Sequence, residues 1–372
     1  MSKWEWKKLK DICEKGSSNI KQSDLKDLTG DYPIFGASGY IQNVDFYQRN
    51  RDYIGIIKDG SGVGRTMLLP AFSSVIGTLQ YILPKEGNDI KFINYALQNI
   101  DFSKSVQGAA IPHIYFKDYG ETEILVPPLS EQNRIVKFLD EEFSKIDTLK
   151  TNAETNLKNA KELFYAELKK TFHEKGSWKT VQLGEIALEY GRGKSKHRPR
   201  NDECLFGGEY PFIQTGDIRN SGKYVVDYTE TYNEIGLAQS KLWQKGTLCI
   251  TIAANIAETA ILTFPCCFPD SVIGFVPNEQ YSSVDFIYYV ILYFRTELQK
   301  ISKGAAQDNL NLAKLESMEF PLPPLSVQKE IVARLDKLSE NVKRLEANYK
   351  QIIANCDELK KSILKKTFEG ES

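Results

Sequence analysis

A long segment that occurs twice limits how this chain can fold more than any other feature. Residues 127–136 read Pro-Pro-Leu-Ser-Glu-Gln-Asn-Arg-Ile-Val, and residues 323–332 read Pro-Pro-Leu-Ser-Val-Gln-Lys-Glu-Ile-Val. The match has an offset of 196, continues without a gap to residues 172 and 368, and includes 19 identities in 46 positions. A match of this length at one offset indicates a duplication, so the architecture must contain two related halves.

The duplication extends more weakly into the residues before each segment. Residues 108–110 match residues 304–306 at the same offset, and Gly30-Asp31-Tyr32-Pro33 matches residues 208–211 at an offset of 178. Nearer the start of each copy the offset is 174, so the front half of the second copy contains 22 extra residues. We therefore predict two globular domains, residues 1–126 and 176–322, each followed by a copy of the repeated segment, residues 127–175 and 323–372.

The repeated segments predict two long helices with the apolar pattern of a coiled coil. From Ile331 to Ile363, apolar residues alternate steps of four and three, which is a heptad repeat. Each helix is expected to begin after the Pro-Pro pair, with Ser130 or Ser326 as the N-cap. The residues assigned to the helix starts and to the apolar seam are Ser130, Gln132, Ile135, Leu139, Ile146, Leu149, Ser326, Gln328, Ile331, Leu335, Val342 and Leu345.

Connectivity predicts how the two helices run. The second domain starts where the first helix ends, and it also begins the second helix, so the helices must be antiparallel if their seams are to cover each other. This arrangement predicts two similar domains held apart by a two-helix spacer, related by an approximate two-fold axis. An ordinary domain core or an oligomer interface remains the alternative explanation of the heptads.

The residues before each repeated segment predict α+β domains. Short apolar runs such as residues 53–57, 66–69, 247–252 and 272–276 are separated by turn residues and indicate strands. One helix is expected in each domain, over residues 90–99 and 284–300. The fold class is therefore mixed α+β, with the two domains built on one plan.

A basic loop in the second domain is a candidate for contact with a nucleic acid. Five cations and no acid occur between residues 192 and 200. Such a loop suits a phosphate backbone, and its arginines are able to read guanine edges. A solvated charged loop is the alternative. The candidate residues are Arg192, Lys194, Lys196, Arg198 and Arg200.

Two glycine turns of the first domain supply further candidates. The first, residues 58–65, offers Lys58, Ser61 and Arg65 beside a turn that lacks the Gly-Lys-Ser/Thr ending of a Walker A loop. The second offers Gln107 and His113, and its equivalent in the second domain offers Lys303 and Gln307. Plain hairpin or structural turns would explain these residues equally well.

The sequence contains no recognisable active site. Lys plus Arg (48) nearly balances Asp plus Glu (49), and six cysteines with three histidines form no metal-binding motif, so neither a catalytic group nor a metal ligand is assigned. Methyltransferase, nuclease and dinucleotide-binding motifs are also missing. No apolar run approaches the ~18 residues that a membrane span requires, and no signal peptide is recognised, so a cytoplasmic protein without membrane association is expected.

Two variable domains, each followed by Pro-Pro-Leu-Ser-x-Gln and a long helix, resemble the specificity subunit of type I restriction-modification enzymes. The resemblance implies that the domains are target recognition domains for double-stranded DNA and that the chain is not itself an enzyme. It also implies that the helices dock two modification subunits, which methylate adenine with S-adenosylmethionine. Restriction subunits with ATP- and Mg-dependent translocation and nuclease activity are expected to join them.

The resemblance further implies an asymmetric, bipartite DNA target. Because the two domains differ in sequence, each is expected to read a different half-site, while the helices set the number of unread base pairs between the halves. Phosphate contacts would position the domains and base contacts would specify the sequence. The alternative is an adaptor whose two domains bind proteins instead of DNA.

Overall fold

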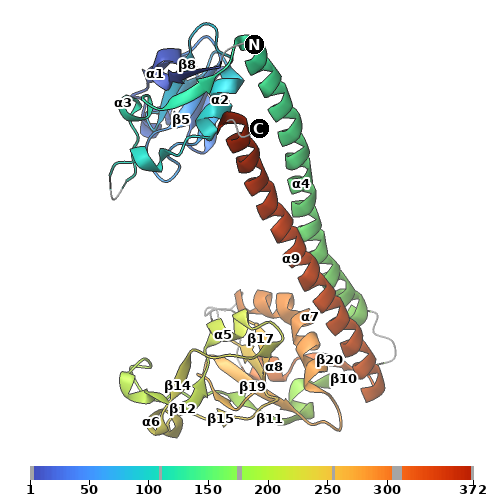
Figure 1. Cartoon of the computed structure of the whole chain (residues 1–372). Coiled ribbons are helices and arrows are strands. Elements are labelled where there is room, and N and C mark those ends of the chain that lie inside the picture. Colours follow the sequence, from blue (N-terminus) through green and yellow to red (C-terminus); the bar gives the residue numbers. More distant parts are fainter. Residues whose placement is uncertain (1–3, 109–110, 174–177, 254–255, 304–311, 370–372) are drawn as a thin grey trace. The chain divides into compact units, whose positions relative to one another are not determined.

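The computed structural model describes residues 4–108, 111–173, 178–253, 256–303 and 312–369 (Figure 1). The chain divides into two compact units, Met1–Thr155 with Tyr349–Ser372, and Asn156–Asn348. Each unit therefore contains one globular domain, the N-terminal part of the long helix that follows it, and the C-terminal part of the other long helix. We call these the first and second units.

The first domain contains a four-stranded and a three-stranded sheet. The larger sheet has the order β2-β8-β5-β6 and the smaller one β4-β3-β7, while β1 pairs with β9 at the domain boundary. The strands are β1 (Glu5–Lys8), β2 (Cys13–Ser17), β3 (Tyr32–Gly36), β4 (Gly39–Val44), β5 (Tyr53–Ile57), β6 (Thr66–Leu69), β7 (Ser74–Val75), β8 (Leu79–Pro84) and β9 (Glu123–Val126). The helices are α1 (Leu9–Ile12), α2 (Ile90–Gln98), α3 (Phe116–Tyr119), η1 (Gln22–Leu25) and η2 (Phe102–Ser105).

The second domain repeats this plan with additions. Its larger sheet has the order β11-β19-β16-β17-β13 and its smaller sheet β14-β12-β18-β15, while β10 pairs with β20. The strands are β10 (Lys179–Gln182), β11 (Ala187–Arg192), β12 (Phe206–Phe212), β13 (Tyr224–Val225), β14 (Glu230–Tyr232), β15 (Leu242–Trp243), β16 (Leu248–Thr251), β17 (Thr259–Leu262), β18 (Cys266–Cys267), β19 (Val272–Pro277) and β20 (Glu319–Leu322). The helices are α5 (Thr215–Asn220), α6 (Glu234–Ala238), α7 (Val284–Lys303), α8 (Leu312–Glu316), η3 (Leu183–Ile186) and η4 (Glu203–Leu205).

Strand pairing confirms that the two domains share one α+β fold. The parallel pair β3 and β7 of the first domain corresponds to the parallel pair β12 and β18 of the second. Where the first domain joins β3 to β4 by a tight hairpin, the second inserts α5 and β13. The extra residues of the second copy therefore extend the existing sheets.

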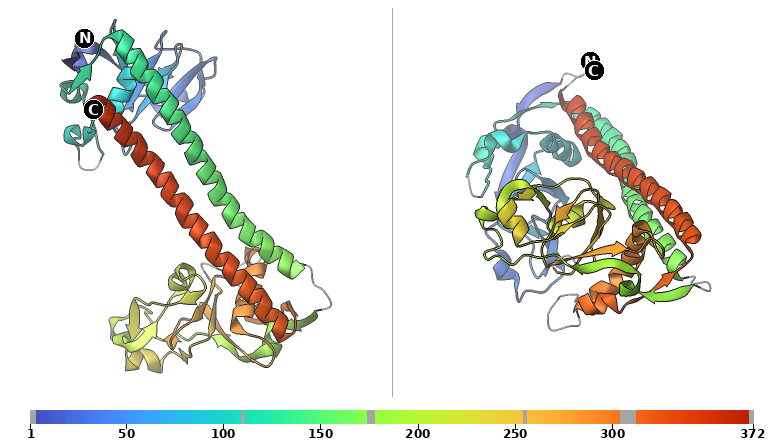
Figure 2. Two further views of the ribbon diagram at one scale, coloured as in Figure 1. Left: turned by 45° about the vertical axis from the view of Figure 1, so that its right-hand side comes forward. Right: turned by 90° about the horizontal axis from the view of Figure 1, so that it is seen from below.

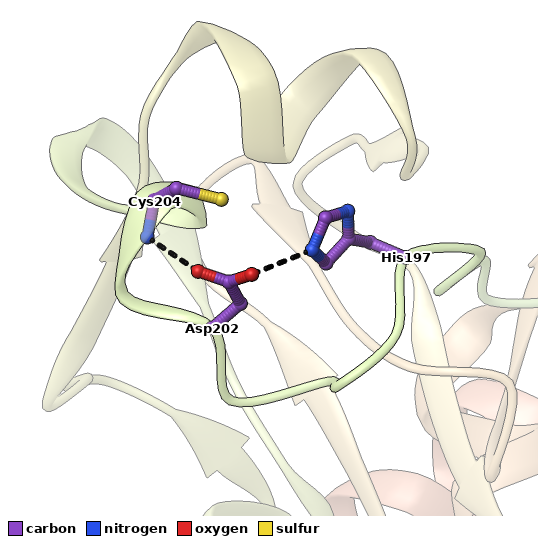
Figure 3. Close-up of side chains that lie close together, drawn as sticks. All are labelled: His197, Asp202 and Cys204. Atoms are coloured by element: carbon purple, nitrogen blue, oxygen red, sulfur yellow. Dashed lines mark hydrogen bonds and ion pairs between the residues drawn. The ribbon is translucent and has the colours of Figure 1, made fainter.

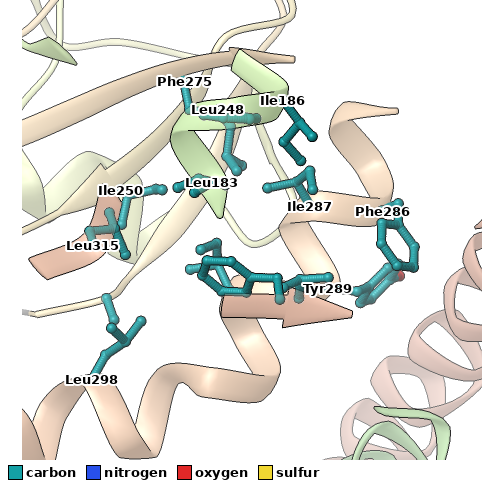
Figure 4. Packing of buried hydrophobic residues seen from close by; sticks show 14 of the residues in the cluster. Leu183, Ile186, Leu248, Ile250, Phe275, Phe286, Ile287, Tyr289, Leu298 and Leu315 are labelled. Carbon is teal, nitrogen blue, oxygen red and sulfur yellow. The ribbon is translucent and has the colours of Figure 1, made fainter. Parts of the chain in front are cut away.

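The core of the second unit gathers side chains from the sheet, from α7 and from both long helices. Leu248, Ile250 and Phe275 come from the sheet, while Phe286 and Ile287 come from α7, and all are fully buried (Figure 4). Further members of the same cluster are Leu168, Phe172, Ile331 and Leu335 from the long helices. The helices therefore belong to the hydrophobic core of the unit.

Each repeated segment forms one 45-residue helix, α4 (Leu129–His173) and α9 (Leu325–Glu369), drawn as continuous green and red ribbons in Figure 2. The prediction that Ser130 and Ser326 are N-caps is wrong, because the helices begin at Leu129 and Leu325, two residues earlier than those caps imply. The carbonyl oxygen of Pro128 accepts hydrogen bonds from the amides of Glu131 and Gln132, at 2.9 and 3.0 Å. A proline has no N–H to leave unsatisfied, so it can occupy the helix boundary, and the exposed serine moves into the first turn.

Within each unit the two long helices are antiparallel, as predicted. In the first unit, the Nζ of Lys150 lies 2.6 Å from a carboxylate oxygen of Asp357. Three residues earlier on α4, Asp147 pairs at 2.6 Å with Lys360, which lies three residues later on α9. In the second unit, Arg334 of α9 donates a hydrogen bond of 2.8 Å to the Oγ1 of Thr171, near the end of α4.

The predicted seam is correct at some positions and wrong at others. Leu139, Ile146, Ile331, Leu335 and Val342 are buried, but Leu149 is 51% exposed and Leu345 is 36% exposed. On α4 the stripe that faces the second helix continues through the buried Phe143 and the half-buried Lys150 instead of Leu149. Lys150 can occupy this stripe because its aliphatic stem packs while its ammonium group reaches Asp357.

Candidate nucleic-acid interface

In the first domain, the structure brings the two predicted glycine turns together. The backbone of His113 forms bridges with both Asp59 and Gln107, and the amide of Ile114 donates to the carbonyl of Lys58 at 3.0 Å. The Nδ1 of His113 lies 2.7 Å from a carboxylate oxygen of Asp59, and the Nζ of Lys58 lies 3.4 Å from the other. We call the surface formed by Lys58, Asp59, Ser61, Arg65, Gln107 and His113 the first-domain loop cluster.

Backbone geometry decides which groups of this cluster can meet a phosphate. Gly60 and Gly64 adopt φ values of +96° and +86°, which favour glycine and let the chain reverse tightly. The amides of Gly60, Val63 and Gly64 donate to carbonyl oxygens within the protein, at 2.9 to 3.2 Å. These amides are therefore already used, and the charge available to a ligand comes from the side chains of Lys58 and the exposed Arg65.

In the second domain, the five cations of the predicted basic loop are all exposed. The loop backbone packs closely against the backbone at Phe268. A Cβ on Gly193 would lie 2.2 Å from the carbonyl oxygen of Phe268, so only glycine fits there. The side-chain oxygen of Gln239 accepts hydrogen bonds from the amides of Lys196 and His197, at 2.7 and 3.1 Å. This anchoring leaves the cationic side chains on the outside.

The five cations are not equivalent. Arg198 donates to the carbonyls of Ser195 and His197, and Arg200 pairs with Asp270 at 2.8 Å. The other three have no carboxylate within salt-bridge distance among the residues that the structure describes, and these are Arg192, Lys194 and Lys196. These three therefore have the most charge available for phosphate groups, while Arg198 also shapes the loop.

A cleft of about 530 Å³ that no local sequence pattern indicates lies beside the basic loop. At its base, the rings of Phe212 and Tyr232 stack with their centroids 4.1 Å apart. The side-chain Nε2 of Gln214 donates to Glu230 at 3.0 Å, and both residues line the cleft together with Arg200. An amide, a carboxylate and a guanidinium around an aromatic floor are suited to reading base edges.

The other two predicted contact residues of the second domain are Lys303 and Gln307. Gln307 lies outside the described residues, and Lys303 is the last residue of α7, with a side chain that is not described. The first-domain loop cluster therefore has no described counterpart at residues 303–307.

Gln132 and Gln328, assigned to the helix starts, lie inside the protein. Gln328 is fully buried, its Nε2 donates to the carbonyls of Tyr281 and Pro323, and its Oε1 accepts from Ser282 and Ser283, at 2.8 to 3.2 Å. Gln132 is 1% exposed and makes equivalent bonds. Its Nε2 donates to Pro127 at 2.9 Å and its Oε1 accepts from Asp89 at 2.8 Å. Each glutamine therefore fastens the start of a long helix to the loop before α2 or α7.

A second contact between domain and helix is also repeated. The hydroxyl of Tyr95 on α2 donates to Asp140 of α4 at 2.6 Å, and Tyr289 on α7 donates to Asp336 of α9. A lysine joins each pair. Burial opposes ionisation of Asp140, but hydrogen bonds from Lys91 and Tyr95 outweigh it and hold the pKa of this carboxyl below its ordinary value. Each domain is thus fixed to its own long helix by charge-assisted hydrogen bonds.

Aromatic contacts join each domain to the other long helix. In the first unit the ring of Phe92 on α2 lies 5.3 Å from that of Phe368, in the last turn of α9. In the second unit the ring of Phe286 on α7 lies 5.8 Å from that of Phe172, in the last turn of α4. Phe172 and Phe368 are equivalent in the duplication, so the two units are built by one scheme.

The chain matches the family model described as Type I restriction modification DNA specificity domain over residues 1–159 and 175–354. A curated relative, the type I restriction enzyme MjaVIII specificity subunit of Methanocaldococcus jannaschii, is 25% identical over 99% of this chain and 92% of the relative. The EcoR124I/EcoR124II specificity subunit of Escherichia coli is 26% identical over 60% of this chain and 57% of the relative.

Two solved structures share the fold. One, from work on complex assembly and conformational transition of the type I R-M system, aligns with a TM-score of 0.78 and 20% identity over 98% of this chain and 97% of that chain. The HsdS subunit from Thermoanaerobacter tengcongensis aligns with a TM-score of 0.61 and 19% identity over 99% and 97%. No helix among the described residues is both long and apolar enough to span a membrane.

Proposed function

This chain belongs to the type I restriction-modification DNA specificity family, and we infer from this membership that it is the DNA sequence-recognition subunit of a type I restriction-modification complex. The observation that carries the inference is the double match, one specificity domain on each half of the duplication. The adaptor alternative is not favoured, because the matching family is one of DNA specificity.

We propose that each domain reads one half of an asymmetric, bipartite target. The first-domain loop cluster and the basic loop of the second domain differ in composition, so they would contact different sequences. Lys58, Arg65, Arg192, Lys194 and Lys196 would bind phosphates and set the register on the duplex. The rim of the second-domain cleft, with Gln214 and Glu230, would supply base contacts.

Specificity subunits recognise DNA and are generally non-catalytic. We propose that methyl transfer from S-adenosylmethionine belongs to two modification subunits docked on the long helices. ATP- and Mg-dependent translocation and cleavage would belong to restriction subunits. The exposed Ser130, Ser326, Leu149 and Leu345 lie on helix surfaces that such partners could cover.

The test of this function is a mobility-shift assay of the chain with a modification subunit, using duplexes chosen from methylation mapping of the source cell. One bipartite, adenine-methylated motif is expected, and only duplexes containing it should bind tightly. Scrambling either half-site should weaken binding, by about 1–3 kcal/mol for each base pair that is read. Equal binding to every duplex would refute sequence recognition.

The spacer role has its own test. One heptad is inserted into α4 between residues 155 and 156 and another into α9 between residues 348 and 349, at the boundaries of the two units. Seven residues add about 10 Å of helix, so the unread gap should grow by about three base pairs while both half-sites stay the same. Insertion into α4 alone is the control and should impair folding, because it shifts the two seams out of register. An unchanged gap in the double insertion would contradict the spacer role.

A further inference from the structure

Three side chains with metal-binding atoms converge at the end of the basic loop. They are His197, Asp202 and Cys204, and their nearest ligand atoms all lie within 4.8 Å of one another (Figure 3). The Nε2 of His197 lies 2.9 Å from the Oδ2 of Asp202. In the close-up, the sulfur of Cys204 lies on the same side of the loop as the imidazole and the carboxylate.

The local fold holds these three residues in place. Asp202 is the N-cap of η4, and its Oδ1 accepts from the amide of Cys204 at 3.1 Å. The side chain of Asn233 donates to the carbonyl of Cys204 at 2.9 Å, and Gln239 accepts from the amide of His197 at 3.1 Å. Both ends of the segment are thus anchored to the residues around α6, so the three ligands would need little rearrangement to bind an ion.

The donor set selects the kind of ion. A thiolate sulfur, an imidazole nitrogen and a carboxylate oxygen together suit zinc and related divalent transition ions. Calcium and magnesium prefer sites built from oxygen alone. Among the six cysteines, Cys204 is the one that is exposed, since the other five are buried.

The same geometry argues against a nucleophilic cysteine. Asp202 is hydrogen-bonded to both neighbours, and the bonds from His197 and Cys204 lower the pKa of Asp202 to about 2. The bond to Asp202 raises the pKa of the Cys204 thiol, which keeps it protonated and a poor nucleophile. A divalent ion would reverse this state of the thiol, because it binds the thiolate.

We propose that His197, Asp202 and Cys204 form a zinc site on the recognition surface of the second domain, with the fourth position open to water. On binding, the Cys204 thiol loses its proton to solvent as the Zn–S bond forms. The imidazole gives up to solvent the Nε2 proton that faces Asp202 and takes one from solvent on Nδ1, so that Nε2 binds the ion and the ring stays neutral. One proton is released for each zinc ion, so affinity rises with pH.

The site would close a loop that contains two of the candidate DNA contacts. Arg198 and Arg200 lie between His197 and Asp202, and an ion joining the two ends would restrict their motion before DNA arrives. This consequence rests on the proposed function, whereas metal binding itself does not.

The experiment uses the full chain without DNA, stripped of metal. Cobalt(II) is titrated as a zinc substitute, and a thiolate-to-cobalt charge-transfer band is expected to saturate at one ion per chain and to disappear when zinc is added. In parallel, a thiol reagent should modify one cysteine of the native protein, and zinc should protect it.

Three variants and one control decide the assignment. Cys204→Ser should abolish the band, while His197→Ala and Asp202→Asn should weaken zinc binding by at least about 10- to 100-fold. Asn at 202 retains an oxygen that can cap η4, so loss of binding in this variant would not be a loss of the local fold. His173→Ala, which changes an exposed histidine at the end of α4, should bind as the unmodified chain does.

A band that persists in Cys204→Ser, or a thiol that zinc does not protect, would overturn the site. DNA affinity is then measured separately, with zinc and with a chelator. A chain that binds zinc but no specific DNA would refute the proposed function while the zinc site stands. A chain that binds specific DNA but no zinc would refute the site alone.

Discussion

Replacing the buried Gln328 by alanine tests whether the repeated glutamine holds a domain on its helix. The side chain is fully buried and makes four hydrogen bonds, to Tyr281, Ser282, Ser283 and Pro323. Gln328→Ala removes all four at once and leaves two carbonyls, an amide and a hydroxyl without this partner. None of these groups belongs to a predicted DNA contact, so the effect should be one of stability.

The size of the effect follows from the number of bonds. A hydrogen bond contributes about 1 kcal/mol net, and a buried group left unsatisfied costs about 1–3 kcal/mol. The hydroxyl of Ser282 retains an interaction with Ser283 at 3.3 Å, and water entering the vacated space would satisfy some of the other groups. We therefore expect the free energy of unfolding of the second unit to fall by about 2–4 kcal/mol.

The matched control is Gln351→Ala. Gln351 lies on the same helix and is exposed, and within the described part of the chain its side chain bonds only to Asn355, one turn away, at 2.8 Å. This control should change stability by less than about 0.5 kcal/mol. Gln132→Ala should fall between the two, because Gln132 makes two short bonds and one of 3.4 Å.

The measurement is denaturant unfolding, combined with hydrogen exchange to locate the effect. Faster exchange is expected at the amide of Ser283 and over the first turns of α9, with the first unit unaffected. Gln132→Ala should affect the first unit instead. If Gln328→Ala and Gln351→Ala unfold at the same denaturant concentration, the glutamine does not fasten the helix and the reasoning fails.

Three other predictions concern the first unit and the basic loop. The pKa of Asp140 is lowered in the folded state, so its carboxylate stabilises the protein above the ordinary carboxyl pKa of about 4. This contribution is lost as pH falls through the lowered pKa. The difference in Tm between the unmodified chain and Asp140→Asn should therefore be large at pH 7 and should shrink in acid. Phe368→Ala should destabilise the first unit by about 3 kcal/mol, with faster hydrogen exchange in α2, although residue 368 lies in the last turn of α9. Replacing Arg192, Lys194 and Lys196 together by alanine should reduce the slope of log affinity for DNA against log salt by roughly 3, whereas a triple replacement of lysines elsewhere on the surface should leave it unchanged.

The sequence predicted most of the fold because its strongest signals are local or repeated. The two helices after Pro-Pro were placed to within two residues of their start, and α2 and β5 were found from their apolar patterns. The phase of the seam was wrong at Leu149 because two overlapping stripes share Leu139 and Ile146. Only contact with the second helix, through Phe143 and Lys150, chooses between those stripes.

The candidate site was predicted less well, because its parts come from distant segments. The composition of residues 192–200 identified the basic loop, but the contact between Asp59 and His113 depends on how two separate turns pack. Gln214 and Glu230 meet through strand pairing of β12 with β14, which no local pattern reveals. His197, Asp202 and Cys204 match no standard metal-binding motif, although they lie within eight residues of one another.

The duplication has a consequence for how each domain acquires its core. Phe368 belongs to the hydrophobic cluster of the first unit and Phe172 to that of the second, so each domain is completed by the last turn of the other repeat's helix. The glutamine and the Tyr–Asp pair, in contrast, join each domain to its own helix. A domain so held from both helices cannot rotate on its support without losing buried hydrogen bonds on one side and aromatic packing on the other. The orientation of each recognition surface is therefore fixed by the repeated segment, and this leaves the exposed loops free to differ between the two copies.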